Sequence, residues 1–323
     1  MRTVKLLAAI AIPVVLAVPA AHAAQPTFPE KPIRLVIGSA PGSGPDIISR
    51  VVAERLWKSW GQRIVVDARP GAAGTISADL VTRAAPDGYT WMMLTSQLLV
   101  ATSVYPNLKF NLAKDFASIS LIGTVPFVLV VNPQVPAKSI AELIAIAKKA
   151  PGSLRYGSAG AGASEHLSGV LFTRLTGTDM LHVPYTGVAQ AIAATMAQEV
   201  QLTYGVLPAV LPMVQAGRIR ALGVTSRKRA ALLPDVPSIS EVVPGYETLG
   251  WYSLVAPTGT PPALLDKISA EVVKAVKAPE VGEQLKGLGI ALVGSSRAEL
   301  DSFRRDQTKR ISELVKAAGV DLK

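Results

Sequence analysis

Two glycine-rich loops are the parts of this chain whose residue types could do chemistry. The first, GSAPGSG at 38–44, follows an apolar strand at 33–37, and the second, GSAGAGA at 157–163, follows a strand at 154–156. Each loop leads into the start of a helix. Glycine lets the backbone approach a ligand closely, and the first N–H groups of a helix lack intrahelical partners and favour an anion. The pattern therefore predicts two loops that bind an anionic group from opposite sides.

The first loop does not have the sequence of a nucleotide-binding loop. A phosphate-binding loop ends in Gly-Lys-Ser or Gly-Lys-Thr, whereas Gly44 is followed here by Pro45 and Asp46. Gly42 and Gly44 supply only the first half of a dinucleotide fingerprint. We therefore predict no nucleotide cofactor.

A hydrolase would have to use Ser158 or Ser164 with His166 or His182. Neither serine lies in a G-x-S-x-G motif. We expect His166, near a helix start, to be structural or a ligand contact, and His182, in a strand, to be a core histidine. Enzymatic activity stays open as an alternative, although the loops offer mainly glycine, alanine and serine.

A metal site is not indicated by the residue pattern. The chain has no cysteine and no H-E-x-x-H motif, and the side chains of Glu165 and His166 are expected to diverge on a helix. Asp46 is expected to stabilise the first turn of its helix, a structural role worth about 0.3–1 kcal/mol. No metal and no other cofactor are predicted.

Alternating strands and helices predict an α/β fold. Helices are expected to open at the capping boxes of Ser139 and Ser296, and a further helix is expected from Pro261 to about Lys277. The expected strands span residues 33–37, 63–67, 89–94, 127–131, 154–156, 180–183, 200–204, 221–225 and 251–256.

The 323 residues are enough for about two domains, and strands near Phe127 and Trp251 are placed to cross between them. Open α/β sheets bind ligands at the carboxyl ends of their strands, so the two loops are expected on separate lobes facing one cleft. The expected boundaries are a discontinuous first lobe, 24–125 and 249–323, and a second lobe, 126–248.

Residues 1–23 are expected to be a removed secretion signal. They combine Arg2 and Lys5, an apolar run to Val18 and the small-x-small sequence AHA at 21–23. The run is too short and too interrupted by proline for a membrane anchor. With no cysteine in the chain, this predicts a Gram-negative periplasmic location. The net charge of +10 is scattered, which fits attraction of anionic solutes and argues against nucleic acid.

Six short strings carry a resemblance to a known family. They are KPIRLV at 31–36, APGSGPD at 40–46, RPGAAG at 69–74, APDGYT at 85–90, HVPY at 182–185 and LPDVP at 233–237. Together they resemble the extracytoplasmic solute receptors of tripartite tricarboxylate transporters, of the Bug type. The resemblance implies a type II periplasmic binding protein with two lobes of mixed, mostly parallel sheets around a ligand cleft.

The resemblance also implies a function. The two loops would close as a pincer on a ligand carboxylate, and the loaded receptor, a monomer by default, would deliver the ligand to membrane permease subunits. An enzyme on a binding-protein scaffold and a receptor that signals to a membrane sensor stay open as alternatives. The ligand-binding residues implied on the loops are Pro41, Gly42, Ser43, Gly44, Pro45 and Asp46, and Ser158, Ala159, Gly160, Ala161, Gly162, Ala163, Ser164 and His166.

The chain departs from the family at several of these positions. Ser43 replaces the usual glycine and Pro45 the usual threonine, while Ala161 and Ala163 replace hydrogen-bonding side chains. Gly205 stands where relatives often carry aspartate, which would leave space. We therefore expect a less polar, roomier pocket that suits an aromatic or otherwise bulky carboxylate. Further candidates for the pocket walls are the segment from Thr95 to Gln97, Tyr185, Tyr204, Trp251 and the loop 69–75.

Overall fold

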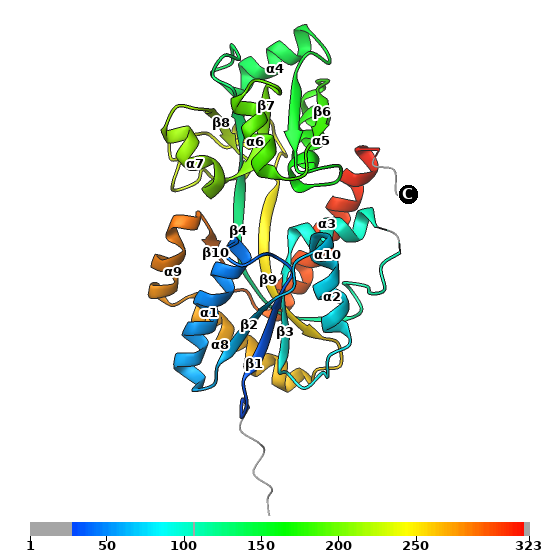
Figure 1. The fold of residues 1–323 in the computed structure, drawn as a ribbon, viewed down its shortest axis with the longest axis vertical. Helices are drawn as coiled ribbons and strands as arrows, with labels where there is room; N and C mark the ends of the chain where they lie inside the picture. Colours follow the sequence, from blue (N-terminus) through cyan, green and yellow to red (C-terminus); the bar gives the residue numbers. More distant parts are fainter. Residues whose placement is uncertain (1–27, 106, 320–323) are drawn as a thin grey trace, which may run out of the picture.

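Two long strands, β4 (Phe116–Val131) and β9 (Leu249–Pro257), run from one lobe of the molecule to the other (Figure 1). They pair antiparallel, with Phe116 opposite Pro257 and Pro126 opposite Leu249. The computed structural model describes residues 28–105 and 107–319, so the expected signal peptide at 1–23 lies outside the described residues. The crossing expected near Phe127 and Trp251 is confirmed.

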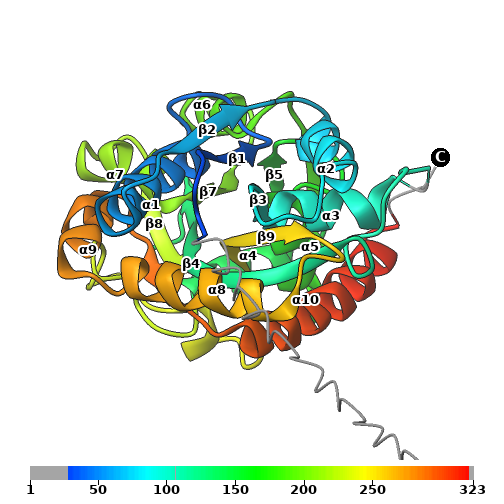
Figure 2. The ribbon, with the colours of Figure 1, turned by 90° about the horizontal axis from the view of Figure 1, so that it is seen from below.

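The first lobe has the strand order β2-β1-β3-β9-β4. Its sheet has helices on both faces, which Figure 2 shows on opposite sides of the strands. Its strands are β1 (Ile33–Ile37), β2 (Ile64–Ala68), β3 (Thr90–Thr95) and the short β10 (Ala291–Leu292), which pairs with β4. One face carries α1 (Gly44–Trp60), α8 (Pro262–Val276) and α9 (Pro279–Leu285), and the other carries α2 (Thr75–Thr82), α3 (Ser96–Val104) and α10 (Arg297–Ala317).

The second lobe continues the order as β4-β7-β5-β6, with β8 also paired to β4. Its strands are β5 (Arg155–Ser158), β6 (Leu181–Pro184), β7 (Leu202–Val206) and β8 (Arg220–Val224). One face carries α4 (Ile140–Lys149) and α5 (Ser164–Thr176), and the other carries α6 (Val188–Met196) and α7 (Leu207–Gln215).

A single apolar cluster extends through both lobes on the side of α3, α5 and α10. It includes Val36 on β1, Tyr156 on β5 and Ile311 on α10, all less than 10% exposed. Burial of apolar surface is the main favourable term in folding. The lobes are therefore joined on this side by a shared core as well as by the two crossing strands.

The expected strands are confirmed to within a few residues, except that β4 begins eleven residues before the expected Phe127. Its first part contains Ser120, Gly123 and Pro126, which interrupt the apolar pattern from which strands are predicted. The sheets are mixed as expected. The parallel pairs are β1–β2, β1–β3, β5–β6 and β5–β7, and every antiparallel pair includes β4 or β9.

The expected helix starts are also confirmed. Ser296 and Glu299 form a complete capping box at α10, and α8 begins at Pro262. At α4 only half of the box forms, because Ser139 accepts from Glu142 N at 3.2 Å while Glu142 Oε2 accepts from Lys138 N at 2.7 Å. The Glu142 carboxylate therefore accepts from the N–H of Lys138 and not from that of Ser139, as a complete box would require, but it still satisfies a free N–H group.

Helix α5 packs unusually close to β5 because Gly169 faces the ring of Tyr156. A methyl group on Gly169 would overlap Cε2 of that ring. The ring is 3% exposed, so it has little room to move. This contact sets the height of α5 above the sheet and so the position of the loop that precedes the helix.

We expect Gly169→Ala to destabilise the protein by about 1–3 kcal/mol, because an added methyl group overpacks this contact. Gly282→Ala is the matched control, since a methyl group on that helical glycine of α9 meets nothing within 4 Å. The control should be neutral or stabilise by up to about 1 kcal/mol. Urea unfolding measures both changes, and equal values would contradict close packing of α5 on β5.

Candidate ligand-binding site

The first glycine-rich loop joins the carboxyl end of β1 to α1, and its shape is held from within. Gly42 N donates to Asp46 Oδ2 at 2.9 Å, and Asp46 pairs with Arg50 at 2.9 Å. The hydrogen bond from Arg50 is the main cause that lowers the pKa of the Asp46 carboxyl below its usual range. Asp46 is thus an ionised residue that organises the loop.

Several hydrogen-bond donors remain at the start of α1. The N–H groups of Gly44 and Asp46 belong to its first turn, where no intrahelical carbonyl is available. The Ser43 hydroxyl is enclosed and makes no hydrogen bond to a described residue. The Tyr252 hydroxyl lies 3.4 Å from the position of a methyl group on Gly44, and burial raises the pKa of Tyr252 to about 12. Tyr252 is therefore a neutral donor beside this loop.

The second glycine-rich loop joins β5 to α5, and two histidines hold its shape. Ser158 Oγ lies 2.6 Å from Nε2 of His182 and accepts from Gly160 N at 3.1 Å. Gly162 N donates to Nδ1 of His166 at 2.9 Å. The N–H groups of both glycines are thus used within the loop.

The glycines therefore shape the two loops, while their neighbours keep the free donors. Gly42, Gly160 and Gly162 all have positive φ, at 79°, 120° and 76°, a region that other residues rarely adopt. Ala161 and Ser164 make no hydrogen bond through their N–H groups to another described residue. An anion at this loop would meet those amides at the start of α5.

The second loop touches the first lobe. A methyl group on Gly162 would lie 2.7 Å from Cγ2 of Val104, at the end of α3. Only glycine lets the loop approach this closely. Gly162 thus combines a positive φ with an interlobe contact.

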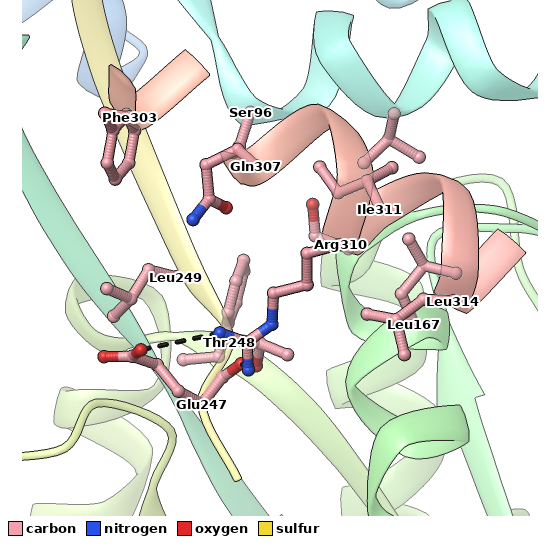
Figure 3. Close-up of a pocket in the computed structure, with 13 residues that line it drawn as sticks. Ser96, Leu167, Glu247, Thr248, Leu249, Phe303, Gln307, Arg310, Ile311 and Leu314 are labelled. Atoms are coloured by element: carbon pink, nitrogen blue, oxygen red, sulfur yellow. Dashed lines mark hydrogen bonds and ion pairs between the residues drawn. The ribbon is translucent and has the colours of Figure 1, made fainter. Parts of the chain in front are cut away.

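A cavity of about 140 Å³ lies between the lobes on the α10 side (Figure 3). Ser96 and Ser164, the first residues of α3 and α5, line it from the two lobes. Their hydroxyls make no hydrogen bond to a described residue. Its apolar walls come from the crossing strands, α3, α5 and α10, through Val100, Phe127, Leu167, Leu249, Phe303, Ile311 and Leu314.

The charged groups of this cavity are already paired. In Figure 3 the guanidinium of Arg310 points toward Glu247, and its Nη1 lies 3.5 Å from Glu247 Oε2. Arg310 Nη2 also donates to the carbonyl of Glu247, and Arg227 pairs with the same carboxylate at 3.0 Å. This network ties α10 to the segment that leads into β9.

Thr95 and Gln97 lie beside the first loop. The Thr95 hydroxyl caps α3 by accepting from Leu98 N at 3.4 Å. Both residues line a small cavity together with Gly38, Ser39 and Gly74. The loop 69–75 is therefore brought to the same place as the start of the first glycine-rich loop.

The space expected at Gly205 is absent, so that expectation is wrong. Gly205 is buried, and a methyl group on it would overlap Cγ1 of Val210 in the apolar packing under α7. Tyr204 and Trp251 are at most 1% exposed and belong to the core. Tyr185 packs its ring against Gly157. Burial, and secondarily the charge of Glu199, raises the pKa of the Tyr185 hydroxyl.

Sequence reasoning missed Tyr252, Val104 and Arg310, while Ser96 lies within the candidate segment from Thr95 to Gln97. One signal was available for Tyr252, which must face the opposite side of β9 from Trp251, the residue that packs on Phe303 of α10. Val104 and Arg310 carry no local signal, because only the tertiary fold brings α3 and α10 to the lobe boundary.

The arrangement can bind an anion with neutral donors from both lobes. Helices α3 and α5 both begin at the interlobe cavity, and helix starts carry partial positive charge. Within residues 28–105 and 107–319, no group of three His, Asp or Glu side chains is placed to hold a metal ion. The same residues include no helix that is both long and apolar enough to span a bilayer.

Three comparisons with known proteins agree. Residues 48–320 match a family described as "Tripartite tricarboxylate transporter family receptor". The UPF0065 protein in the tcbD-tcbE intergenic region of Pseudomonas sp. (strain P51) is 37% identical over 290 residues, 89% of this chain and 86% of the relative. A structure from R. palustris with adipate has a TM-score of 0.79 and 33% identity, covering 90% of this chain and 98% of that one.

The structure of the periplasmic binding protein BugD has a TM-score of 0.74 and 31% identity, covering 91% of this chain and 99% of that one. The two-lobed α/β architecture and these similarities confirm the fold and the resemblance expected from the six strings. The chain belongs to the receptor family of tripartite tricarboxylate transporters, as a Bug-type member with the fold of a periplasmic binding protein.

Proposed function

We propose that this protein captures a small carboxylate between its lobes and delivers it to the permease of a tripartite tricarboxylate transporter. The observation that supports this most is that Ser96 and Ser164, at the starts of helices from the two lobes, line one cavity with unpaired hydroxyls. Two helix starts and two hydroxyls on an apolar-walled cavity suit a carboxylate with an apolar body. A protein of similar fold and sequence was solved with adipate.

Binding works through closure of the lobes. Donors at the start of α1 and α3 lie on the first lobe, here residues 24–125 and 249–323, and those at the start of α5 lie on the second, 126–248. A carboxylate between Ser96 and Ser164 meets donors of both lobes, and closure shortens these contacts. The ligand therefore shifts the population toward the closed form, because that form makes the shorter contacts.

The ligand is an aromatic or otherwise bulky carboxylate. The size of the interlobe cavity supports this ligand class, in place of the space that was expected at Gly205. The interlobe cavity of about 140 Å³ is similar in size to an engineered protein cavity of about 150 Å³ that binds benzene. The rings of Phe127 and Phe303 form part of its wall.

The protein acts in the periplasm as a binding protein without enzymatic activity. Export depends on the secretion signal proposed for residues 1–23, and a monomer suits a receptor whose lobes must move freely. The carboxylate of Asp46 is engaged by Arg50, and Ser158 is fully buried. Neither group is available for acid or nucleophilic chemistry.

Isothermal titration calorimetry of the mature protein tests the ligand class. Benzoate and terephthalate should bind, benzamide should not, and adipate and citrate show how far aliphatic acids are accepted. Strong binding of citrate with silent aromatic acids would rule out the aromatic class. Silence of every carboxylate would rule out the proposed function.

We expect Ser96→Ala and Ser164→Ala each to weaken binding of the best carboxylate. A hydrogen bond to a charged group contributes about 1.5–3 kcal/mol, which corresponds to a loss of about 10- to 100-fold. Ser103→Ala, on α3 but outside the cavity lining, is the control and should bind normally. Unchanged calorimetric affinity in both variants would place the carboxylate elsewhere.

Gly162→Ala should weaken binding by at least about tenfold, because its methyl group meets Val104 and keeps the lobes apart. Val104→Ala in the same chain should restore part of the affinity. Gly245→Ala is the control for backbone strain, since Gly245 has φ of 82° and open space around it. If Val104→Ala restores nothing in a double-mutant cycle, interlobe contact at Gly162 does not govern binding.

A further inference from the structure

His166 on α5 and His182 on β6 form a stacked pair under the second glycine-rich loop. Their ring centroids lie 3.8 Å apart and their planes differ by 14°. The ring of Tyr156 lies beside both, at 6.2 Å from His166 and 5.1 Å from His182. His166 is only 6% exposed. Metal binding does not explain the pairing of these imidazoles, because among the described residues they belong to no group of three side chains that could hold a metal ion.

The hydrogen bonds assign a proton to each ring. Gly162 N donates to Nδ1 of His166, so this nitrogen is an acceptor and the proton of the neutral ring is on Nε2. Ser158 Oγ donates to the Gly160 carbonyl at 2.9 Å and accepts from Gly160 N. It can then only accept from His182, so Nε2 of His182 carries a proton.

Each histidine thus fixes one part of the loop. His182 holds Ser158, whose hydroxyl closes a turn with both polar groups of Gly160. His166 holds Gly162, the residue that touches Val104 of the first lobe. Ala161, whose N–H group is a free donor, lies between the two fixed glycines.

We propose that His166 and His182 are positioning residues that hold the second glycine-rich loop in its ligand-binding shape while both rings are neutral, and that acid releases the loop and with it the ligand. This inference rests on the proposed function. A proton on Nδ1 of His166 would turn its acceptor into a donor facing another donor, the N–H of Gly162. The bond that fixes the loop against the first lobe would then be lost.

The surroundings favour neutral rings. Burial, and secondarily the charge of His182, lowers the pKa of His166 to about 4, and burial also lowers the pKa of His182. The titratable neighbours are Tyr156 on β5, whose ring lies beside both imidazoles, and Glu165, which precedes His166 on α5; burial raises the pKa of both. Tyr204 on β7, whose pKa burial also raises, interacts with Tyr156. No carboxylate contributes to stabilising an imidazolium in either ring.

Neutral histidines make the stability of the fold fall as the pH falls. A histidine whose pKa is lower in the folded than in the unfolded state stabilises the fold above its unfolded pKa, near 6.5. That stability is lost as the pH falls from about 6.5 toward about 4. Affinity for the ligand should follow the neutral fraction of His166 in the folded protein.

Two substitutions separate the hydrogen bond from the charge. His166→Gln keeps an acceptor for Gly162 N but does not titrate, and His166→Leu removes the acceptor. Phe172→Leu is the control on the same helix, because that buried ring packs on Tyr246 at 6.1 Å and has no bond to the loop. It should lower stability without changing the pH profile of affinity.

Benzoate affinity is measured by calorimetry from pH 7 to pH 3.5, and the Gly162 amide signal is followed by NMR without ligand. Relative to His166→Gln, the wild type should lose about twofold at pH 4 and about fourfold at pH 3.5, as the neutral fraction of His166 falls. His166→Leu should lose about fivefold to tenfold at pH 7. Titration of benzoate itself cancels in these comparisons.

Identical pH profiles for the wild type and His166→Gln would overturn the inference, and so would a Gly162 amide signal that ignores His166. A Gly162 signal that follows His166, with no binding of benzoate or any other carboxylate at pH 7, would instead overturn the proposed function. The two failures are therefore distinguishable.

Discussion

The antiparallel pairing of β4 with β9 is the constraint on which the rest of the molecule depends. Each strand contributes to the first lobe and continues toward the second, so the two sheets share a frame and their other strands end facing one another. The parallel strands β1 and β3 of one lobe and β5 of the other lead into the helix starts that offer free donors. The glycine-rich loops meet at the lobe boundary because this pair sets where each sheet begins and ends.

The shared core joins the two lobes on the α10 side of the lobe boundary, so that this side differs from the opposite one. On the α10 side, apolar packing runs from β1 through the crossing strands to α5, and Arg310, Glu247 and Arg227 add paired charges. A lobe movement has to keep this packing largely intact, because buried apolar contacts are costly to separate. The interlobe cavity adjoins the fixed side, so its apolar walls on α10 and the crossing strands keep their positions while the lobes close.

Local sequence patterns predicted most of the fold. Capping residues and apolar runs are local, so α10, α8 and the outer strands could be placed from neighbours in the chain. The first half of β4 could not be predicted in this way, because Gly123 and Pro126 are accommodated only by pairing with β9 and by packing under Leu292. The places of the two glycine-rich loops, after β1 and β5, were predicted because their backbone chemistry is local, as at Gly42 and Gly162. The candidate site was missed at Val104 and Arg310, and misjudged at Gly205, because the direction of a side chain across a sheet depends on register.

The most informative feature of the site is that its loops are satisfied before any ligand arrives. Asp46 binds Gly42, Ser158 binds Gly160 and His166 binds Gly162, so three glycine amides that could serve an anion serve the loops instead. This leaves fewer donors, but the remaining ones are already in place, and little conformational entropy is lost on binding. Ordering of loops would otherwise oppose closure. In a receptor built this way, the binding free energy is available to bring the lobes together, and the same internal bonds make the loop sensitive to a proton on His166.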